Sequence, residues 1–186
     1  MSDVVLVSRA YAFAAERHSG QCRDGEKPQP YINHPIEVAE LVTIATKGKD
    51  HTLIAAAVLH DTVEDTSATL AELGKLFNAR IASVVAEVTD DKTLEKTERR
   101  QAQIDGMHGK SDRAKMIKIA DKISNLRGIK TLTLNDWPLE NQVEYLAFSR
   151  KVVDAARGAN GWLERVFEEV ALDLEKHLAD LTRKAE

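Results

Sequence analysis

Apolar residues recur along most of this chain at the spacing of an amphipathic helix. Residues three and four apart share one helix face, since each residue turns about 100°. Pro35 fits the first turn of a helix, where no amide donor is needed, and Asp50 and Thr69 can cap two others. No segment is typical of a strand, and residues 19–33 and 89–97 are predicted as long loops. We predict an all-α fold with helices at residues 4–17, 35–44, 52–61, 70–78, 79–88, 113–127, 139–157 and 162–184.

The apolar run at residues 53–59 leads directly into one histidine and three carboxylates. Such a run is too hydrophobic to face water, so it predicts a buried helix. If this helix continues, the polar residues enter the interior, where carboxylates without a counter-charge are very costly. A divalent metal ion is the simplest partner, and the alternative is an exposed, acid-rich helical turn. The residues concerned are His60, Asp61, Glu64 and Asp65.

The segment at residues 113–127 predicts a helix with an apolar back and a polar front. Met116, Ile119, Ala120, Ile123 and Leu126 form one stripe. On a different side, an acid and an amide lie at i and i+4, near a lysine. The alternative is an ordinary surface face stabilised by ion pairs one helical turn apart. The residues of the polar front are Asp121, Asn125 and Lys118.

Four side chains together predict a metal site: His34, His60, Asp61 and Asp121. His34 precedes Pro35, so the start of a helix would fix its position, although a capping or packed histidine is the alternative. Imidazole and carboxylate ligands suit Mn²⁺, Fe²⁺ or Zn²⁺ better than Ca²⁺. A structural zinc site would typically include thiolates, and this set has none. On an octahedral ion these ligands leave positions open for water or a phosphate oxygen, which indicates catalysis.

Composition is typical of an ordinary globular protein. The chain has 186 residues, 43% hydrophobic and 30% charged, which fits one domain, or one domain with a short appendage. The single cysteine, Cys22, rules out an internal disulfide and suits a reducing compartment. The N-terminus lacks the features of a signal peptide, and no apolar stretch is long enough for a membrane span. We therefore predict a cytoplasmic protein that does not bind membranes.

The charge is unevenly distributed. The formal net charge is −4, which argues against non-specific nucleic-acid binding. Residues 92–130 nevertheless carry eleven Lys or Arg and five Asp or Glu, a local balance of +6. A basic stretch in an acidic protein indicates a small polyanionic ligand, and solvated surface lysines are the alternative.

Four motifs resemble one known family. They are Tyr31-Ile-Asn-His-Pro35, Leu59-His-Asp-Thr-Val-Glu-Asp-Thr66, Val88-Thr-Asp-Asp-Lys92 and Lys118-Ile-Ala-Asp-Lys-Ile-Ser-Asn-Leu-Arg127. Their order resembles the HD superfamily of metal-dependent phosphohydrolases, and more closely the hydrolase domain of the RelA/SpoT family, over about residues 10–157. The chain is similar to the stand-alone small alarmone hydrolases, a group that includes the metazoan SpoT homologue.

The resemblance implies a single HD domain over residues 1–186, a helical bundle with the metal in a central cleft and a C-terminal helix at 160–184 packed on it. The implied substrate is (p)ppGpp, whose 3′-pyrophosphate is removed to give GDP or GTP and pyrophosphate, with Mn²⁺ as the metal. The implied catalytic residues are Glu64 and Asp65, and Glu64 is the first choice for activating water. The implied substrate-binding residues are Arg23, Asn125, Tyr145 and Lys118.

A broader basic approach for the substrate is predicted from Lys92, Lys96, Arg99, Lys118 and Lys122. For Tyr145, ordinary helix packing is the alternative. Two residues depart from the family pattern. Asp24 stands where relatives usually have a basic residue, and Ser124 stands where relatives often have an aromatic residue or histidine. We expect both to alter contacts with the substrate, most directly with its base.

Three alternatives remain open. Another phosphorylated nucleotide, such as NADPH, would give inorganic phosphate as the product. A non-catalytic HD domain that binds a nucleotide or a partner protein would normally lose ligands or the acidic pair, and this chain keeps both. A purely structural helical domain does not explain the polar residues at buried spacing. The last helix is predicted to pack on its own chain, and packing on a second copy, in a homodimer, is the alternative.

Overall fold

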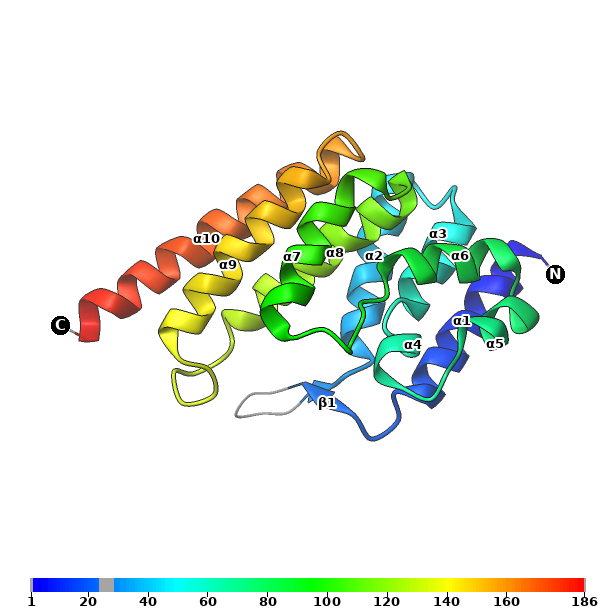
Figure 1. The fold of residues 1–186 in the computed structure, drawn as a ribbon, viewed down its shortest axis with the longest axis horizontal. Coiled ribbons are helices and arrows are strands. Elements are labelled where there is room, and N and C mark those ends of the chain that lie inside the picture. The colour runs from blue at the N-terminus through cyan, green and yellow to red at the C-terminus, as the bar shows by residue number, and fades with distance from the viewer. Residues whose placement is uncertain (1, 24–28, 186) are drawn as a thin grey trace.

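Helices dominate the computed structural model, which describes residues 2–23 and 29–185 (Figure 1), so the all-α prediction is confirmed. The helices are α1 (Asp3–Arg17), α2 (Asn33–Thr46), α3 (His51–Leu59), α4 (Thr62–Asp65), α5 (Leu70–Leu76), α6 (Ala79–Val88), α7 (Lys96–Gly106), the 3₁₀ turn η1 (Met107–Gly109), α8 (Asp112–Ile129), α9 (Leu139–Ala155) and α10 (Gly161–Ala185).

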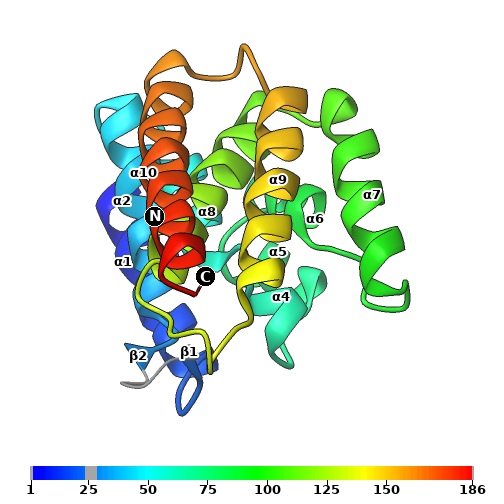
Figure 2. The ribbon, with the colours of Figure 1, turned by 90° about the vertical axis from the view of Figure 1, so that its left-hand side faces the viewer.

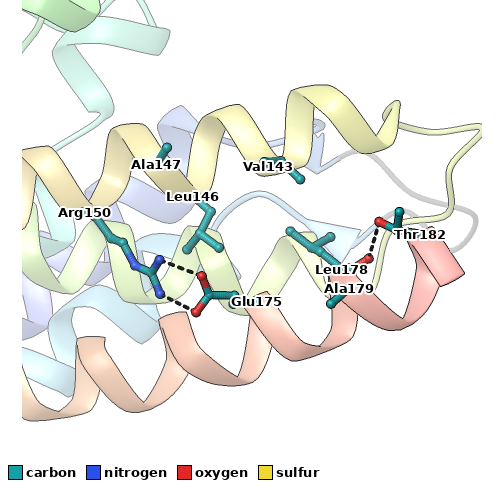
Figure 3. Close-up of a pocket in the computed structure, with 8 residues that line it drawn as sticks. All are labelled: Val143, Leu146, Ala147, Arg150, Glu175, Leu178, Ala179 and Thr182. Carbon is teal, nitrogen blue, oxygen red and sulfur yellow. Dashed lines mark hydrogen bonds and ion pairs between the residues drawn. The ribbon is translucent and has the colours of Figure 1, made fainter.

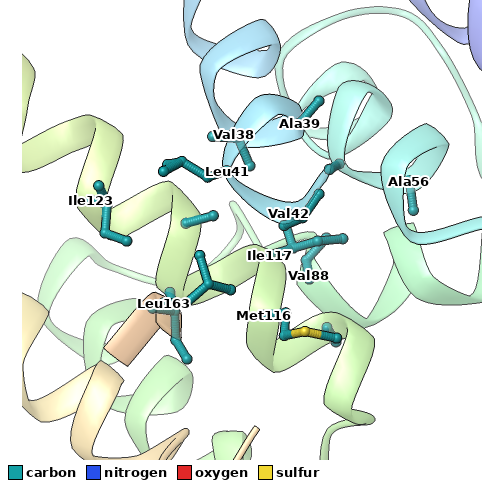
Figure 4. Close-up of a cluster of buried hydrophobic side chains, with 14 of the residues drawn as sticks. Val38, Ala39, Leu41, Val42, Ala56, Val88, Met116, Ile117, Ile123 and Leu163 are labelled. Carbon is teal, nitrogen blue, oxygen red and sulfur yellow. The ribbon is translucent and has the colours of Figure 1, made fainter. Parts of the chain in front are cut away.

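Helix α8 runs through the middle of the molecule. It contacts α2, α3, α6, α9 and α10, which surround it (Figures 1 and 2). Val38 and Val42 of α2 and Leu163 of α10 gather around its apolar residues, such as Ile117 (Figure 4). The polar front of α8 is not a solvated face either, because Lys118 and Asp121 are buried and Asn125 is half-buried. The alternative of a solvated surface face is therefore wrong.

Most of helix α3 is buried too. Every residue from Leu53 to Leu59 is buried, and α1, α2 and α6 pack around it. Asp50 begins the helix by accepting a hydrogen bond from the Leu53 amide at 3.0 Å, which is a normal N-cap. The helix ends at Leu59, two residues earlier than predicted. The hydroxyl of Thr62 donates to the Leu59 carbonyl at 2.7 Å, and the chain turns at His60 and Asp61 before α4 begins.

Helix α7 and a small β-hairpin were among the elements absent from the sequence prediction. Helix α7 lies beside α9 at one edge of the molecule (Figure 2), and it has no buried side chain. It lacks an apolar stripe, so hydrophobic periodicity could not reveal it, although a capping box of Glu95 and Glu98 begins it. Strands β1 (Cys22–Arg23) and β2 (Gln29–Pro30) form a small antiparallel hairpin. Two residues are too few to show the alternation of a strand.

Helices α9 and α10 pair along the remaining side. The guanidinium of Arg150 donates to both carboxylate oxygens of Glu175, at 3.0 and 2.9 Å. Leu146 and Leu178 lie next to this pair in a shallow groove between the two helices (Figure 3). Helix α10 also packs on α8, where Phe167 is buried. Within the described residues, no helix is both long and apolar enough to cross a membrane.

Candidate metal and active site

The four predicted metal ligands come from three separate elements. His34 lies in the first turn of α2, His60 and Asp61 form the turn between α3 and α4, and Asp121 lies in α8. Most residues of α3 and α8 are buried. Because residues up to 87 positions apart meet here, the site exists only once α2, α3 and α8 have packed together.

The donor atoms of these side chains converge. One donor atom each of His34, His60 and Asp121 lies within 4.8 Å of the others. Nε2 of His34 lies 3.3 Å from Asp121 Oδ1 and 3.4 Å from Asp61 Oδ2. Nε2 of His60 lies 3.0 Å from Asp61 Oδ2. The structure thus brings all four side chains together.

The hydrogen bond at Nδ1 of His60 shows that its other ring nitrogen, Nε2, faces the candidate metal centre. Nδ1 of His60 lies 2.8 Å from the Ala57 carbonyl, which can only accept, so Nδ1 carries the proton. Nε2 of His60 is buried and has no hydrogen-bond partner in the described residues. It therefore presents a lone pair toward a carboxylate oxygen. Two acceptors that face each other need a proton or a metal ion between them.

The pKa values of the site also indicate that it favours a bound positive charge. Burial lowers the pKa of His34, but hydrogen bonds to Asp121 and Asp61 raise it to about 9. Burial raises the pKa of Asp121, but Lys122 and His34 lower it well below the usual range. The cluster therefore favours bound positive charge. Imidazole and carboxylate donors without thiolates fit a divalent ion such as Mn²⁺, Fe²⁺ or Zn²⁺.

Glu64 and Asp65 lie in α4, beside the candidate metal centre. Oε2 of Glu64 accepts a hydrogen bond from the Asp90 backbone amide at 3.0 Å. Burial, together with the charge of Asp90, raises the pKa of Glu64. Lys92 forms an ion pair with Asp65, so this lysine neutralises an acid instead of facing the cleft.

Tyr31, which was not among the site residues predicted from the sequence, joins the carboxylates of Asp61 and Asp65. Its hydroxyl lies 2.7 Å from Asp61 Oδ2 and 3.1 Å from Asp65 Oδ2. Burial and Asp61 raise its pKa far above the usual value, so the hydroxyl stays protonated and donates. Its place three residues before His34 in a recognised motif was the available signal.

A cleft of about 270 Å³ lies over these groups. Its polar lining contains the acids Asp61, Glu64, Asp65, Asp90 and Asp121, and the cations Lys96, Arg99, Arg100, Lys118 and Lys122. Four of the five lysines and arginines predicted as a basic approach therefore line it, and Lys92 is the exception. The acids lie around the metal ligands, and the cations include one face of α7.

The cationic face of α7 includes two residues that were missed, Arg100 and Gln103. The guanidinium carbon of Arg100 lies 5.6 Å from the ring centre of Tyr145 and 5.1 Å from that of Phe148, within cation–π distance. Lys96, Arg99, Arg100 and Gln103 all line the cleft. Their spacing of i, i+3, i+4 and i+7 is that of one helix face, and it could have indicated α7.

The four predicted substrate-binding residues lie in or next to this cleft. Nζ of the buried Lys118 lies 3.4 Å from Asp90 Oδ1. Asn125 donates to Asp121 Oδ1 at 2.6 Å and accepts from Arg23 at 2.8 Å. Tyr145 lines the cleft, and its ring lies 5.6 Å from that of Trp137.

The two departures from the family pattern have different outcomes. Asp24 lies outside the described residues. Ser124 is fully buried and forms hydrogen bonds with His34 and Glu37, while the cleft is lined by its neighbours on α8. Ser124 therefore does not line the cleft and lies against the back of His34, a predicted metal ligand, so its effect on contacts with the base stays a prediction.

Known proteins place the chain in a family. An HD domain model matches residues 10–144. Guanosine-3′,5′-bis(diphosphate) 3′-pyrophosphohydrolase MESH1 of Xenopus tropicalis is 40% identical over 172 residues, which are 92% of this chain and 96% of that protein. The human protein of the same name is 40% identical over 167 residues, which are 90% and 93% of the two chains.

A solved structure agrees with these sequence matches. It is described as a metazoan orthologue of SpoT that hydrolyzes ppGpp and plays a role in starvation responses. It superposes with a TM-score of 0.85 at 39% identity and covers 89% of this chain and 93% of that one. The chain therefore belongs to the HD domain family, in the branch that contains the MESH1 pyrophosphohydrolases.

Proposed function

We propose that this chain is a metal-dependent (p)ppGpp 3′-pyrophosphohydrolase. It would hydrolyse guanosine-3′,5′-bis(diphosphate), or its triphosphate analogue, to GDP or GTP and pyrophosphate. The observation that carries the proposal is the convergence of His34, His60 and Asp121, with Asp61 beside both histidines, beneath a cleft with five cationic residues. Relatives with this named activity align over nearly their whole length. We also propose that residues 1–186 act as a single hydrolase domain.

The metal would be held by His34, His60, Asp61 and Asp121, and we propose Mn²⁺, with Fe²⁺ or Zn²⁺ as alternatives. A bound ion of this kind supplies a Lewis acid for the phosphoryl oxygen and lowers the pKa of water. His60 and His34 offer nitrogen ligands, and the low pKa of Asp121 keeps its carboxylate ionised. Ligands that are fixed by the packing of the elements around them hold such a centre in place.

Glu64 would accept the proton of the attacking water. A general base works best when its pKa approaches the working pH, and burial raises that of Glu64. The hydrogen bond from the Asp90 amide occupies Oε2, which leaves Oε1 for the water. Asp65, held by the Tyr31 hydroxyl, would assist proton transfer.

The cationic residues would bind the phosphate groups. Lys118 and Lys122 lie near Asp121 on α8, and Lys96, Arg99 and Arg100 line the cleft from α7. Arg23 and Asn125 would contact the nucleotide, since a guanidinium binds phosphates and also stacks on bases. Tyr145 would pack against the ribose. A cytoplasmic location remains a prediction from the sequence.

Product analysis tests this proposal. Metal-stripped protein is incubated with ppGpp, with and without Mn²⁺, and nucleotides and phosphates are separated by ion exchange. GDP and pyrophosphate that appear only with Mn²⁺ are the expected result. Absence of ppGpp turnover by metal-loaded protein would contradict the proposal. Release of inorganic phosphate from NADPH in parallel would then identify another phosphorylated nucleotide as the substrate.

A further inference from the structure

Ser124 lies behind a metal ligand, outside the lining of the cleft. It is in the middle of α8, three residues after Asp121, and is fully buried. Its Oγ lies 2.9 Å from Nδ1 of His34 and 2.6 Å from Oε2 of Glu37. Both partners belong to α2, one helical turn apart. The serine therefore connects a carboxylate to an imidazole across two helices.

The positions of the protons in this chain follow from the chemistry of its members. A carboxylate can only accept, so the hydroxyl proton of Ser124 goes to Glu37. A lone pair of Oγ then accepts the Nδ1 proton of His34. When a metal ion replaces the Nε2 proton, the Nε2 lone pair of His34 faces the same centre as Asp121 Oδ1 and Asp61 Oδ2, which lie 3.3 and 3.4 Å away.

Glu37 is itself held in place. Its other oxygen, Oε1, accepts a hydrogen bond from Arg127 at 2.7 Å, so both carboxylate oxygens have a partner. The two metal-binding histidines are thus oriented by different means. His60 depends on the Ala57 backbone carbonyl, which no substitution removes, whereas His34 depends on a side chain that can be changed.

We infer that Ser124 is a positioning residue that fixes the tautomer and ring orientation of His34 for metal binding, and that Glu37 acts on His34 through it. The inference rests on the proposed metal centre. Partners on the far nitrogen of a ligating histidine orient its ring and make it a more basic ligand, and their loss typically costs about 10- to 100-fold in metal affinity. Here a serine transmits the effect of the carboxylate.

The first test is Mn²⁺ binding to metal-stripped protein without nucleotide, measured by titration calorimetry and by electron paramagnetic resonance of the bound ion. Ser124→Ala is expected to weaken Mn²⁺ binding about 10- to 100-fold. Ser124→Thr keeps the hydroxyl and is expected to restore tight binding. The matched control is Ser149→Ala, in α9, which removes a buried hydroxyl that has no hydrogen-bond partner in the described part of the chain. Its Kd for Mn²⁺ is expected to match that of the wild type.

The second test asks whether Glu37 acts on His34 through Ser124, as a relay, or whether the two residues act independently. It does not depend on whether threonine fits at position 124. Glu37→Gln is expected to weaken Mn²⁺ binding, by less than Ser124→Ala. The double variant is expected to bind no more weakly than Ser124→Ala, because Glu37 acts through the serine. Additive losses overturn the relay.

The outcomes distinguish this inference from the proposed function. An unchanged Kd for Mn²⁺ in Ser124→Ala overturns the positioning role, while Mn²⁺-dependent hydrolysis of ppGpp by the same protein leaves the proposed function intact. A wild-type protein that binds no Mn²⁺ overturns the proposed metal centre, and the inference with it.

Discussion

At the scale of single residues, the site separates groups that can hold a metal from groups that can move a proton. Asp61 and Asp121 have their pKa lowered by neighbouring histidines or a lysine, against the effect of burial. Glu64 has its pKa raised, chiefly by burial. When the environments of two nearby carboxylates shift their pKa values in opposite directions, the shifts help to assign different roles to the two groups.

Glu64→Gln is expected to lower kcat by about 10²- to 10⁴-fold, the usual contribution of a general base. The glutamine keeps the size of the side chain and can still accept the Asp90 amide, so Mn²⁺ affinity should stay at the wild-type value. Pyrophosphate release and calorimetric metal titration measure the two quantities. Wild-type kcat would contradict the role as base, and loss of Mn²⁺ binding would instead indicate a ligand.

Tyr31→Phe is expected to lower kcat/KM by about 10- to 100-fold, because hydrogen bonds to charged groups contribute about 1.5–3 kcal/mol. The phenyl ring preserves the packing against His18 and His34 and removes only the hydroxyl shared by Asp61 and Asp65. Steady-state kinetics is the measurement. The matched control is Tyr11→Phe in α1, which should keep wild-type kinetics. Equal kinetics for both variants would contradict a functional role for the Tyr31 hydroxyl.

At the scale of elements, α3 and α7 differ in what they contribute. Helix α3 is apolar on every side and buried, so it anchors the turn that carries His60 and Asp61. Helix α7 has no buried side chain, yet several of its polar residues line the cleft. Substitutions on α7 should therefore alter substrate binding with little effect on folding.

Arg99→Ala is expected to raise KM for ppGpp about tenfold or more, since one charge-assisted contact to phosphate is lost. The melting temperature should stay close to that of the wild type. The increase in KM should shrink at high salt, because screening weakens the lost interaction. Arg80→Ala, on the exposed surface of α6, is the control and should keep the wild-type KM. An unchanged KM in Arg99→Ala would exclude a role for this arginine in substrate binding.

At the scale of the whole molecule, the candidate metal centre joins α2, α8 and the α3–α4 turn. A ligand that binds the folded state alone stabilises it in proportion to the logarithm of its concentration. The metal should therefore stabilise the folded state by cross-linking these elements, in addition to its role in hydrolysis.

Mn²⁺ at about 100 times its Kd is expected to stabilise the metal-stripped protein by about 2.7 kcal/mol. For a chain of this size, that free energy corresponds to an increase in melting temperature of about 5–11 °C. Differential scanning fluorimetry with and without chelator measures the shift, and His60→Ala should abolish it. An equal shift in wild type and His60→Ala would place the bound Mn²⁺ elsewhere.

Much of this protein could be predicted from its sequence. The long helices and the buried run of α3 follow from periodicity, which is a local property of the chain. His34, His60, Asp61 and Asp121 stood in recognisable motifs beside apolar segments, and the structure brings them together. Local patterns therefore indicated the fold class and the candidate metal ligands.

Tertiary structure decided the rest. The end of α3 at Leu59 and the formation of α7 depend on contacts with other elements, and the pattern of apolar residues does not indicate those contacts. Tyr31 meets Asp61 and Asp65 only because the chain folds back over 30 and 34 positions. Ser124 reaches His34 across 90 positions, so its role depends on the packing of α2 against α8. Periodicity reports which face of a helix is buried, but the identity of the opposing side chain is set by packing between elements.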